Sequence, residues 1–144
     1  METRLIENPE EIIKRITDFT INSSELSVSF AAGGMQFNYA YFFDSKKKIL
    51  EKYKKGEHKG IRYISSIDSS NLEVTKKFLN VGAHIKHATN LPPMSFGVSD
   101  KEMITTIDKM YEGEVVSSIL VSNDPAYMSH FRAIFEELWN RRCR

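Results

Sequence analysis

Four histidines and one cysteine are the side chains of this sequence best suited to metal binding or covalent catalysis: His58, His84, His87, His130 and Cys143. A zinc site needs three or four nitrogen or sulfur ligands at short, repeated spacing, and only His84 and His87 lie that close together. We expect these two on one strand, where a separation of three residues points them to opposite faces. Cys143 could act as a nucleophile only with a base beside it, which a thiol so close to a chain terminus seldom has. The sequence therefore predicts no metal, no cofactor and no catalytic residue.

A glycine pair marks a candidate ligand site. Gly33–Gly34 lies between a predicted strand and a predicted helix, where doubly wound proteins bind anions. It lacks the spacing of both the dinucleotide and the P-loop motifs, so a tight exit from the strand is the alternative. Sheets with parallel strands bind ligands beyond the carboxyl ends of those strands. On that ground the candidate ligand-binding residues are Gly33, Gly34, Ser66, Asp68, Lys86 and His87, each also compatible with a turn or a structural hydrogen bond.

Residues 46–59 form a basic segment. It holds seven lysines and two glutamates, a local charge of +5 in a chain whose net charge is only +1. The lysines are Lys46, Lys47, Lys48, Lys52, Lys54, Lys55 and Lys59. A solvated helix face is the simpler interpretation, and a patch for phosphate, nucleic acid or an acidic partner is the alternative. Because no arginine-rich or aromatic-interleaved groove accompanies the lysines, we do not expect nucleic acid as a partner.

The elements that must position these residues alternate between helix and strand in the first half. Asn8–Pro9 begins a helix, because Asn8 can cap it and Pro9 needs no amide donor there. The pattern then predicts a strand at residues 26–30, a helix at 35–55 that may break near Asp44–Ser45, a strand at 60–67 and a helix from the capping box Ser70-x-x-Glu73 to Gly82.

The second half is richer in strands. Short extended segments are predicted at residues 83–88, 94–98, 102–107 and 115–121, with turns at 99–101 and 112–113. Asn123–Asp124–Pro125 begins a last helix, whose apolar stripe runs from Tyr127 to Leu138. Strands separated by helices need crossover connections. The sequence therefore predicts an α/β fold with a mixed, partly parallel sheet and helices on both faces, in a single domain over residues 1–144.

Composition restricts the classes of protein that remain. The chain has 144 residues, 41% of them hydrophobic and 27% charged, which is typical of a globular domain. It shows neither an apolar signal peptide nor a stretch long enough to cross a bilayer. We expect a cytoplasmic protein without membrane insertion.

Part of the sequence resembles the phospholipase D superfamily. His84-Ile-Lys86 matches the start of its His-x-Lys-x-x-x-x-Asp motif, but Leu91 stands where the aspartate belongs. Aligned over the whole chain, the motif falls instead on Pro93, Ser95 and Asp100, where only the aspartate is retained. This resemblance implies a phospholipase D-like half-domain with a degenerate, non-catalytic motif.

Several short blocks also resemble the sensor-like domain of histidine kinases from ammonia-oxidising archaea. They are residues 59–64 (Lys-Gly-Ile-Arg-Tyr-Ile), 96–99 (Phe-Gly-Val-Ser) and 135–140 (Phe-x-x-Leu-Trp-Asn). The resemblance implies a sensory domain of a two-component system that binds an unknown small ligand or a downstream kinase domain. It further implies a relay through the last helix and a possible homodimer.

Two other functions are compatible with the sequence. A phospholipase D-like phosphodiesterase or nuclease would act as a dimer and use His84, Lys86 or His87 in an unusual register. An effector-binding domain of an archaeal transcription regulator would accompany a winged-helix module, for which these residues show no pattern. The sequence leaves the ligand unidentified in every case.

Overall fold

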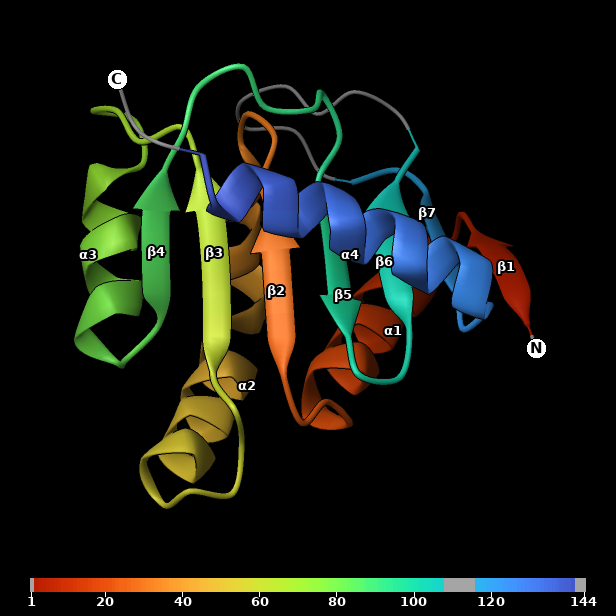
Figure 1. Ribbon diagram of the computed structural model, residues 1–144, viewed down its shortest axis with the longest axis horizontal. Helices are drawn as coiled ribbons and strands as arrows, with labels where there is room; N and C mark the ends of the chain where they lie inside the picture. Colours follow the sequence, from red (N-terminus) through yellow and green to blue (C-terminus); the bar gives the residue numbers. More distant parts are fainter. Residues whose placement is uncertain (1, 108–115, 142–144) are drawn as a thin grey trace.

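The computed structural model describes residues 2–107 and 116–141, which form a seven-stranded mixed sheet with helices on both faces (Figure 1). The elements are β1 (Thr3–Ile6), α1 (Pro9–Ile21), β2 (Leu26–Ser29), α2 (Gly34–Lys54), β3 (Ile61–Ser65), α3 (Leu72–Asn80), β4 (His84–His87), β5 (Phe96–Ser99), β6 (Met103–Thr106), β7 (Ile119–Ser122) and α4 (Pro125–Trp139). The predicted turn at 112–113, the predicted strand residue Val115 and Cys143 lie outside the described residues.

The sheet combines a parallel part and an antiparallel part. Its strand order is β1-β7-β6-β5-β2-β3-β4. β2, β3 and β4 are parallel to one another, and the remaining neighbours are antiparallel. The helical crossovers α2 and α3 connect the parallel strands, as parallel pairing requires. The predicted α/β class and partly parallel sheet are confirmed.

Two layers of helix enclose the sheet. α1 and α2 cover one face and α4 crosses the other, which confirms the prediction of helices on both faces (Figure 1). The larger core lies under α1, α2 and α3 and includes Leu26, Leu50, Ile61 and Tyr63, all at most 1% exposed. The smaller core lies under α4 around Ile64 and Phe135. Both faces of β2 and β3 are therefore buried, as is usual for parallel strands.

Two helices begin as the sequence predicts. At α1, the Asn8 side chain accepts a hydrogen bond from the amide of Glu11 at 3.1 Å, and Pro9 is the first helical residue. At α4, the Asp124 carboxylate accepts from the amide of Ala126 at 2.9 Å and is likewise followed by proline. In both helices, the cap satisfies one of the amides left without an intrahelical partner.

The cap of α4 gives a first test. Asp124→Ala removes the acceptor of the Ala126 amide and is expected to lower the free energy of unfolding by about 1 kcal/mol. Urea denaturation measures the change, and Asp124→Ser should retain most of the wild-type stability because serine caps equally well. Equal midpoints for the alanine variant and the wild type would contradict this role of Asp124.

Other local predictions are wrong. The Ser70-x-x-Glu73 capping box does not form: the helix starts one residue later, after Asn71. The amide of Ser70 instead donates to Asp68, 2.8 Å away, in a turn that precedes the helix. α2 continues through Asp44–Ser45 without a break. Tyr127 does not belong to the buried stripe of α4, because it is 44% exposed.

The longest helix, α2, carries the basic segment at its C-terminal end. It has 21 residues, and its last turn includes Lys52 and Lys54. These cations lie near the negative end of the helix dipole, which they stabilise. Within residues 2–107 and 116–141, no helix is both long and apolar enough to cross a membrane.

Candidate functional site

A crevice of about 410 Å³ lies where β2 and β3 end and α2 and α3 begin. It brings together three of the predicted ligand-binding residues, Gly33, Ser66 and Asp68, and also Pro93 of the degenerate motif. Gly33 precedes α2 with a φ of 79°, a left-handed conformation that glycine adopts without strain. The carboxyl ends of parallel strands thus meet here as predicted from the alternation of strands and helices.

The electrostatics of this crevice do not favour an anion. Asp68 accepts hydrogen bonds from the side chain and the amide of Ser70, and these bonds lower the pKa of Asp68. The carboxylate is therefore charged at neutral pH, next to the start of α3. No lysine, arginine or histidine is among the described residues that line the crevice. A phosphate in this crevice would meet a negative charge without a cation to balance it.

The other predicted ligand-binding residues lie elsewhere. Lys86 donates to the carbonyl oxygen of Trp139 at 2.9 Å, and its Nζ atom lies 4.4 Å from the centroid of the indole ring. His87 Nδ1 accepts from the amide of Ile67 at 2.9 Å. Lys86 thus links the edge strand β4 to the last residue of α4, and His87 links it to Ile67, which follows β3. Gly34 lines a second cavity, described below.

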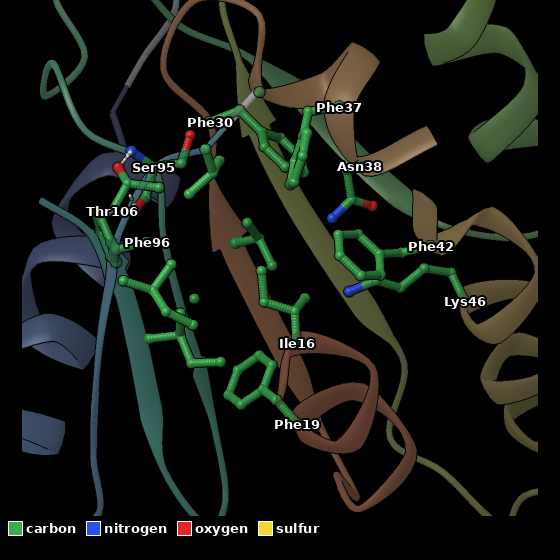
Figure 2. Close-up of a pocket in the computed structure, with 16 residues that line it drawn as sticks. Ile16, Phe19, Phe30, Phe37, Asn38, Phe42, Lys46, Ser95, Phe96 and Thr106 are labelled. Atoms are coloured by element: carbon green, nitrogen blue, oxygen red, sulfur yellow. Dashed lines mark hydrogen bonds between the residues drawn. The ribbon is translucent and has the colours of Figure 1, made fainter. Parts of the chain in front are cut away.

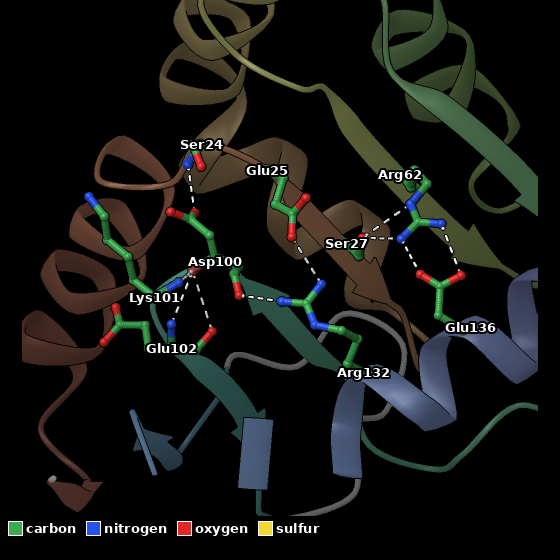
Figure 3. A network of polar contacts seen from close by, with 10 residues as sticks. Ser24, Glu25, Ser27, Arg62, Asp100, Lys101, Glu102, Arg132 and Glu136 are labelled. Atoms are coloured by element: carbon green, nitrogen blue, oxygen red, sulfur yellow. Dashed lines mark hydrogen bonds and ion pairs between the residues drawn. The ribbon is translucent and has the colours of Figure 1, made fainter. Parts of the chain in front are cut away.

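The degenerate motif is spread over both ends of β5. Ser95 precedes the strand, and its hydroxyl accepts from the amide of Ala31 at 2.9 Å. Asp100 follows the strand and accepts from the amide of Ser24 at 2.7 Å (Figure 3). Burial acts to raise the pKa of Asp100, but the hydrogen bonds from Ser24 and from the amides of Asp100 and Glu25 together outweigh it and lower this pKa. Ser95 and Asp100 therefore hold loops in place at opposite ends of one strand.

The second cavity lies inside the larger core, between the sheet and helices α1 and α2 (Figure 2). Its volume is about 60 Å³. The walls are mainly aliphatic and aromatic side chains; the most prominent are Ile16, Phe19, Val28, Phe30, Phe37 and Phe42. Four residues with polar side chains also line it: Asn38, Lys46, Ser95 and Thr106. We refer to this space as the interior cavity.

Lys46 brings a positive charge into the interior cavity. The side chain is 1% exposed and extends from α2 toward the cavity (Figure 2). Within the part of the chain that the structure describes, its Nζ atom has no hydrogen bond and no ion pair, and it lies 5.8 Å from the centroid of the Tyr63 ring. Burial lowers the pKa of Lys46 from 10.5 to about 7. The amine therefore exchanges its proton near physiological pH.

Asn38 places a second donor at the same cavity. Its Oδ1 atom accepts from the hydroxyl of Tyr63 at 3.1 Å, and its side chain is only 7% exposed. That bond fixes the amide so that Nδ2 points toward the cavity (Figure 2). Burial raises the pKa of Tyr63, so its hydroxyl remains protonated and continues to donate. Lys46 and Asn38 thus supply one cation and one oriented neutral donor to a cavity whose walls are mainly apolar.

The position of Lys46 differs from the one that its sequence context predicts. The solvated helix face expected for the lysines of residues 46–59 is wrong for Lys46 alone. The remaining six, Lys47, Lys48, Lys52, Lys54, Lys55 and Lys59, are exposed as expected. The available signal was spacing, because Lys46 falls on the helical stripe of Phe42, Ile49 and Leu50, all of which are buried.

The packing at Gly34 gives a second test. A Cβ atom at Gly34 would lie 2.7 Å from the Ser95 hydroxyl and 3.0 Å from the Phe30 ring. Gly34→Ala should therefore lower stability by about 1–3 kcal/mol, although alanine favours helix. Ser95→Ala should cost about 1 kcal/mol, because the amide of Ala31 loses its acceptor. The double variant should cost less than the two single changes together, and strict additivity in urea denaturation would contradict the clash.

Comparison with known proteins shows what the fold resembles. No protein-family model matches the sequence, and no curated protein matches it. Among solved structures, the chain is similar to TrmBL2, described as an archaeal chromatin protein with a novel mode of DNA binding. The TM-score is 0.68 and the identity 10%, over 96% of this chain and 52% of the TrmBL2 chain. The likeness shows the fold alone. This chain spans about half the length of TrmBL2.

This comparison corrects several expectations from the sequence. The resemblances to histidine-kinase sensor domains and to phospholipase D proteins are wrong, because the similarity found among solved structures is to the fold of TrmBL2. The expected two-component function and the relay through the last helix followed from these resemblances, and both are therefore also wrong. The expectation that nucleic acid is not a partner is also corrected, because TrmBL2, the protein of similar fold, is described as binding DNA. Of the alternatives, the effector-binding domain of a transcription regulator agrees best with the finding.

Proposed function

We propose that this chain is a single, cytoplasmic effector-binding domain of a DNA-associated regulator, and that the effector occupies the interior cavity. The observation that carries the proposal is the unpaired Lys46 ammonium inside apolar walls. A buried charge without a partner is costly, and strongly shifted titratable groups in cavities cluster at functional sites. An effector that pairs with this charge would remove the cost and so bind with a stabilising effect.

The association with DNA is supported by two observations. The fold is similar to that of TrmBL2 along nearly the whole of this chain. Six exposed lysines also gather at the end of α2 and in the segment that follows it, Lys47 to Lys59. Lysines of this kind neutralise phosphates without reading bases, which predicts binding that is independent of sequence and sensitive to salt.

A thermal-shift screen with small metabolites tests the effector. A compound that binds only the folded state, at 100 times its dissociation constant, adds about 2.7 kcal/mol to stability. We expect at least one such compound for the wild-type chain and no shift by it in Lys46→Met. The absence of any stabilising compound in a broad metabolite set would contradict the proposal.

Fluorescence anisotropy with a labelled 20-base-pair duplex tests the contact with DNA. We expect the dissociation constant to rise steeply between 50 and 200 mM salt. Replacing the six exposed lysines by glutamine should weaken binding at least tenfold. A control variant replaces four lysines outside the basic segment, Lys14, Lys76, Lys77 and Lys101, by glutamine. Equal binding by the six-lysine variant and the control would show that residues 47–59 do not contact DNA.

A further inference from the structure

We infer, on the basis of the proposed function, that the effector is a small monocarboxylate with a short apolar tail. Its carboxylate would lie against Lys46 Nζ and Asn38 Nδ2, and its tail among the phenylalanine rings of the interior cavity. Three features of the cavity specify this ligand class: the kind of donors, the nature of the walls and the size.

The donors specify a carboxylate. An ammonium and an amide NH₂ group both donate, so the complementary ligand group accepts hydrogen bonds and is negatively charged. No aspartate or glutamate is among the described residues that line the cavity. Within residues 2–107 and 116–141, the protein therefore supplies no anion for Lys46. A ligand with one negative charge balances the cavity, whereas a dianion would leave a buried charge without a partner.

The walls specify an apolar tail. Phe19, Phe37 and Phe42 surround the space beside the two donors. A hydrated inorganic anion such as nitrate or phosphate needs donors on several sides, and these rings cannot supply them. Methylene groups, in contrast, gain roughly 0.8 kcal/mol each on transfer from water into such surroundings. A carboxylate with an aliphatic end therefore suits the cavity better than an inorganic anion.

The size specifies a short tail. The cavity of about 60 Å³ is roughly four to six times the ~10–15 Å³ that a cavity needs to hold one water molecule. This space accepts acids of about two to four carbons and excludes long fatty acids unless the core rearranges. Propanoate and butanoate are therefore the probes that match both the charge and the volume.

Isothermal titration calorimetry at pH 6.5 tests the inference. At this pH the charged form of Lys46 predominates. The Tyr63 hydroxyl, which faces Asn38, is neutral at this pH. The ring of His58, which follows α2 in the sequence, has a pKa that is lowered chiefly by burial. The probes are propanoate and butanoate, their neutral counterparts propan-1-ol and butanamide, and the inorganic anions chloride, nitrate and phosphate. We expect the two carboxylates to bind at least tenfold more tightly than every other probe.

Three variants assign that binding to the interior cavity. Lys46→Met should reduce carboxylate binding at least tenfold, and Lys14→Met, at an exposed position of α1, should leave it unchanged. Asn38→Asp keeps an acceptor for Tyr63 but places a negative charge in the cavity, so it should also abolish carboxylate binding. Far-ultraviolet circular dichroism of each variant confirms that it is folded.

The possible failures are distinguishable. Equal binding of butanoate and butanamide, or unchanged butanoate binding by Lys46→Met, would overturn the carboxylate inference. If a neutral or inorganic compound instead stabilises the wild type in a Lys46-dependent manner, the inference fails and the proposed function stands. If no probe and no metabolite binds, both fail together.

Discussion

The free energy of unfolding is expected to rise by about 3 kcal/mol between pH 6.5 and pH 9.5, because Lys46 loses its proton in the folded protein over this range. Burial lowers the pKa of Lys46 from 10.5 to about 7. Below pH 7 the folded chain must hold an unpaired ammonium in its core. Above pH 7 this amine becomes neutral, and the free-energy cost of burying Lys46 decreases with each unit of pH.

The sign follows from proton binding. Between pH 7 and pH 10.5 the unfolded chain still binds the Lys46 proton, and the folded chain has released it. Stability increases with pH wherever the unfolded state binds more protons. The other shifted groups act outside the window: the lowered pKa of His58 acts below pH 6.5, and the raised pKa of Tyr63 acts above pH 10. The rise is therefore specific to Lys46.

Lys46→Met tests the origin of this rise. Methionine fills a similar volume without a charge, so the variant should be several kcal/mol more stable than the wild type at pH 6. Its stability should also change little between pH 6.5 and pH 9.5. Urea denaturation at several pH values measures both effects, with Lys47→Met as the exposed control. A variant that keeps the wild-type pH dependence would show that another group is responsible.

Arg62→Ala is expected to lower the free energy of unfolding by roughly 2–4 kcal/mol. Arg62, on β3, donates to both carboxylate oxygens of Glu136 on α4, and to the hydroxyl of Ser27 at 3.1 Å (Figure 3). Its guanidinium carbon also lies 4.8 Å from the centroid of Phe135 and 5.2 Å from that of Trp139. The hydrogen bond from Arg62 is the main cause of the lowered pKa of Glu136. This one side chain thus fastens α4 to the centre of the sheet.

Two further variants separate geometry from charge. Arg62→Lys keeps the charge but cannot form the planar, two-pronged contact, so it should recover less than half of the lost stability. Lys76→Ala removes an exposed ion pair with Glu73 and should change stability by less than about 0.5 kcal/mol. Thermal or urea unfolding measures all three variants. An Arg62→Ala variant as stable as Lys76→Ala would contradict this role of Arg62.

The sequence predicted the elements whose signals are local. Asn8–Pro9 and Asp124–Pro125 begin helices because both the cap and the fixed backbone angle of proline act within a few residues. β1 escaped prediction, because it has only four residues and is held by pairing with β7, more than 110 residues away. No pattern within the strand itself indicates such a distant partner.

The candidate site was predicted only in part, for a physical reason. Gly33, Ser66 and Asp68 meet in one crevice because parallel strands end at the same edge, a rule that needs only the order of elements. The chemistry of the interior cavity depends instead on whether the side chain of Lys46 points toward the sheet or toward solvent. Lys46 and Lys47 are neighbours of the same type, yet the first is 1% exposed and the second is exposed. The rotation of α2 about its own axis, relative to the sheet, determines which of the two side chains is buried.

The pairing of β1 with β7 also has a consequence for the order in which the chain folds. β2, α2, β3, α3 and β4 are consecutive in the sequence and can assemble through short loop closures. Joining Thr3 to Ser122 closes a loop of nearly the whole described chain, so its entropic cost is met only once the intervening strands are in place. We therefore expect β1 to dock last on folding and to detach first on unfolding, which hydrogen exchange would show as the least protected amides of the sheet.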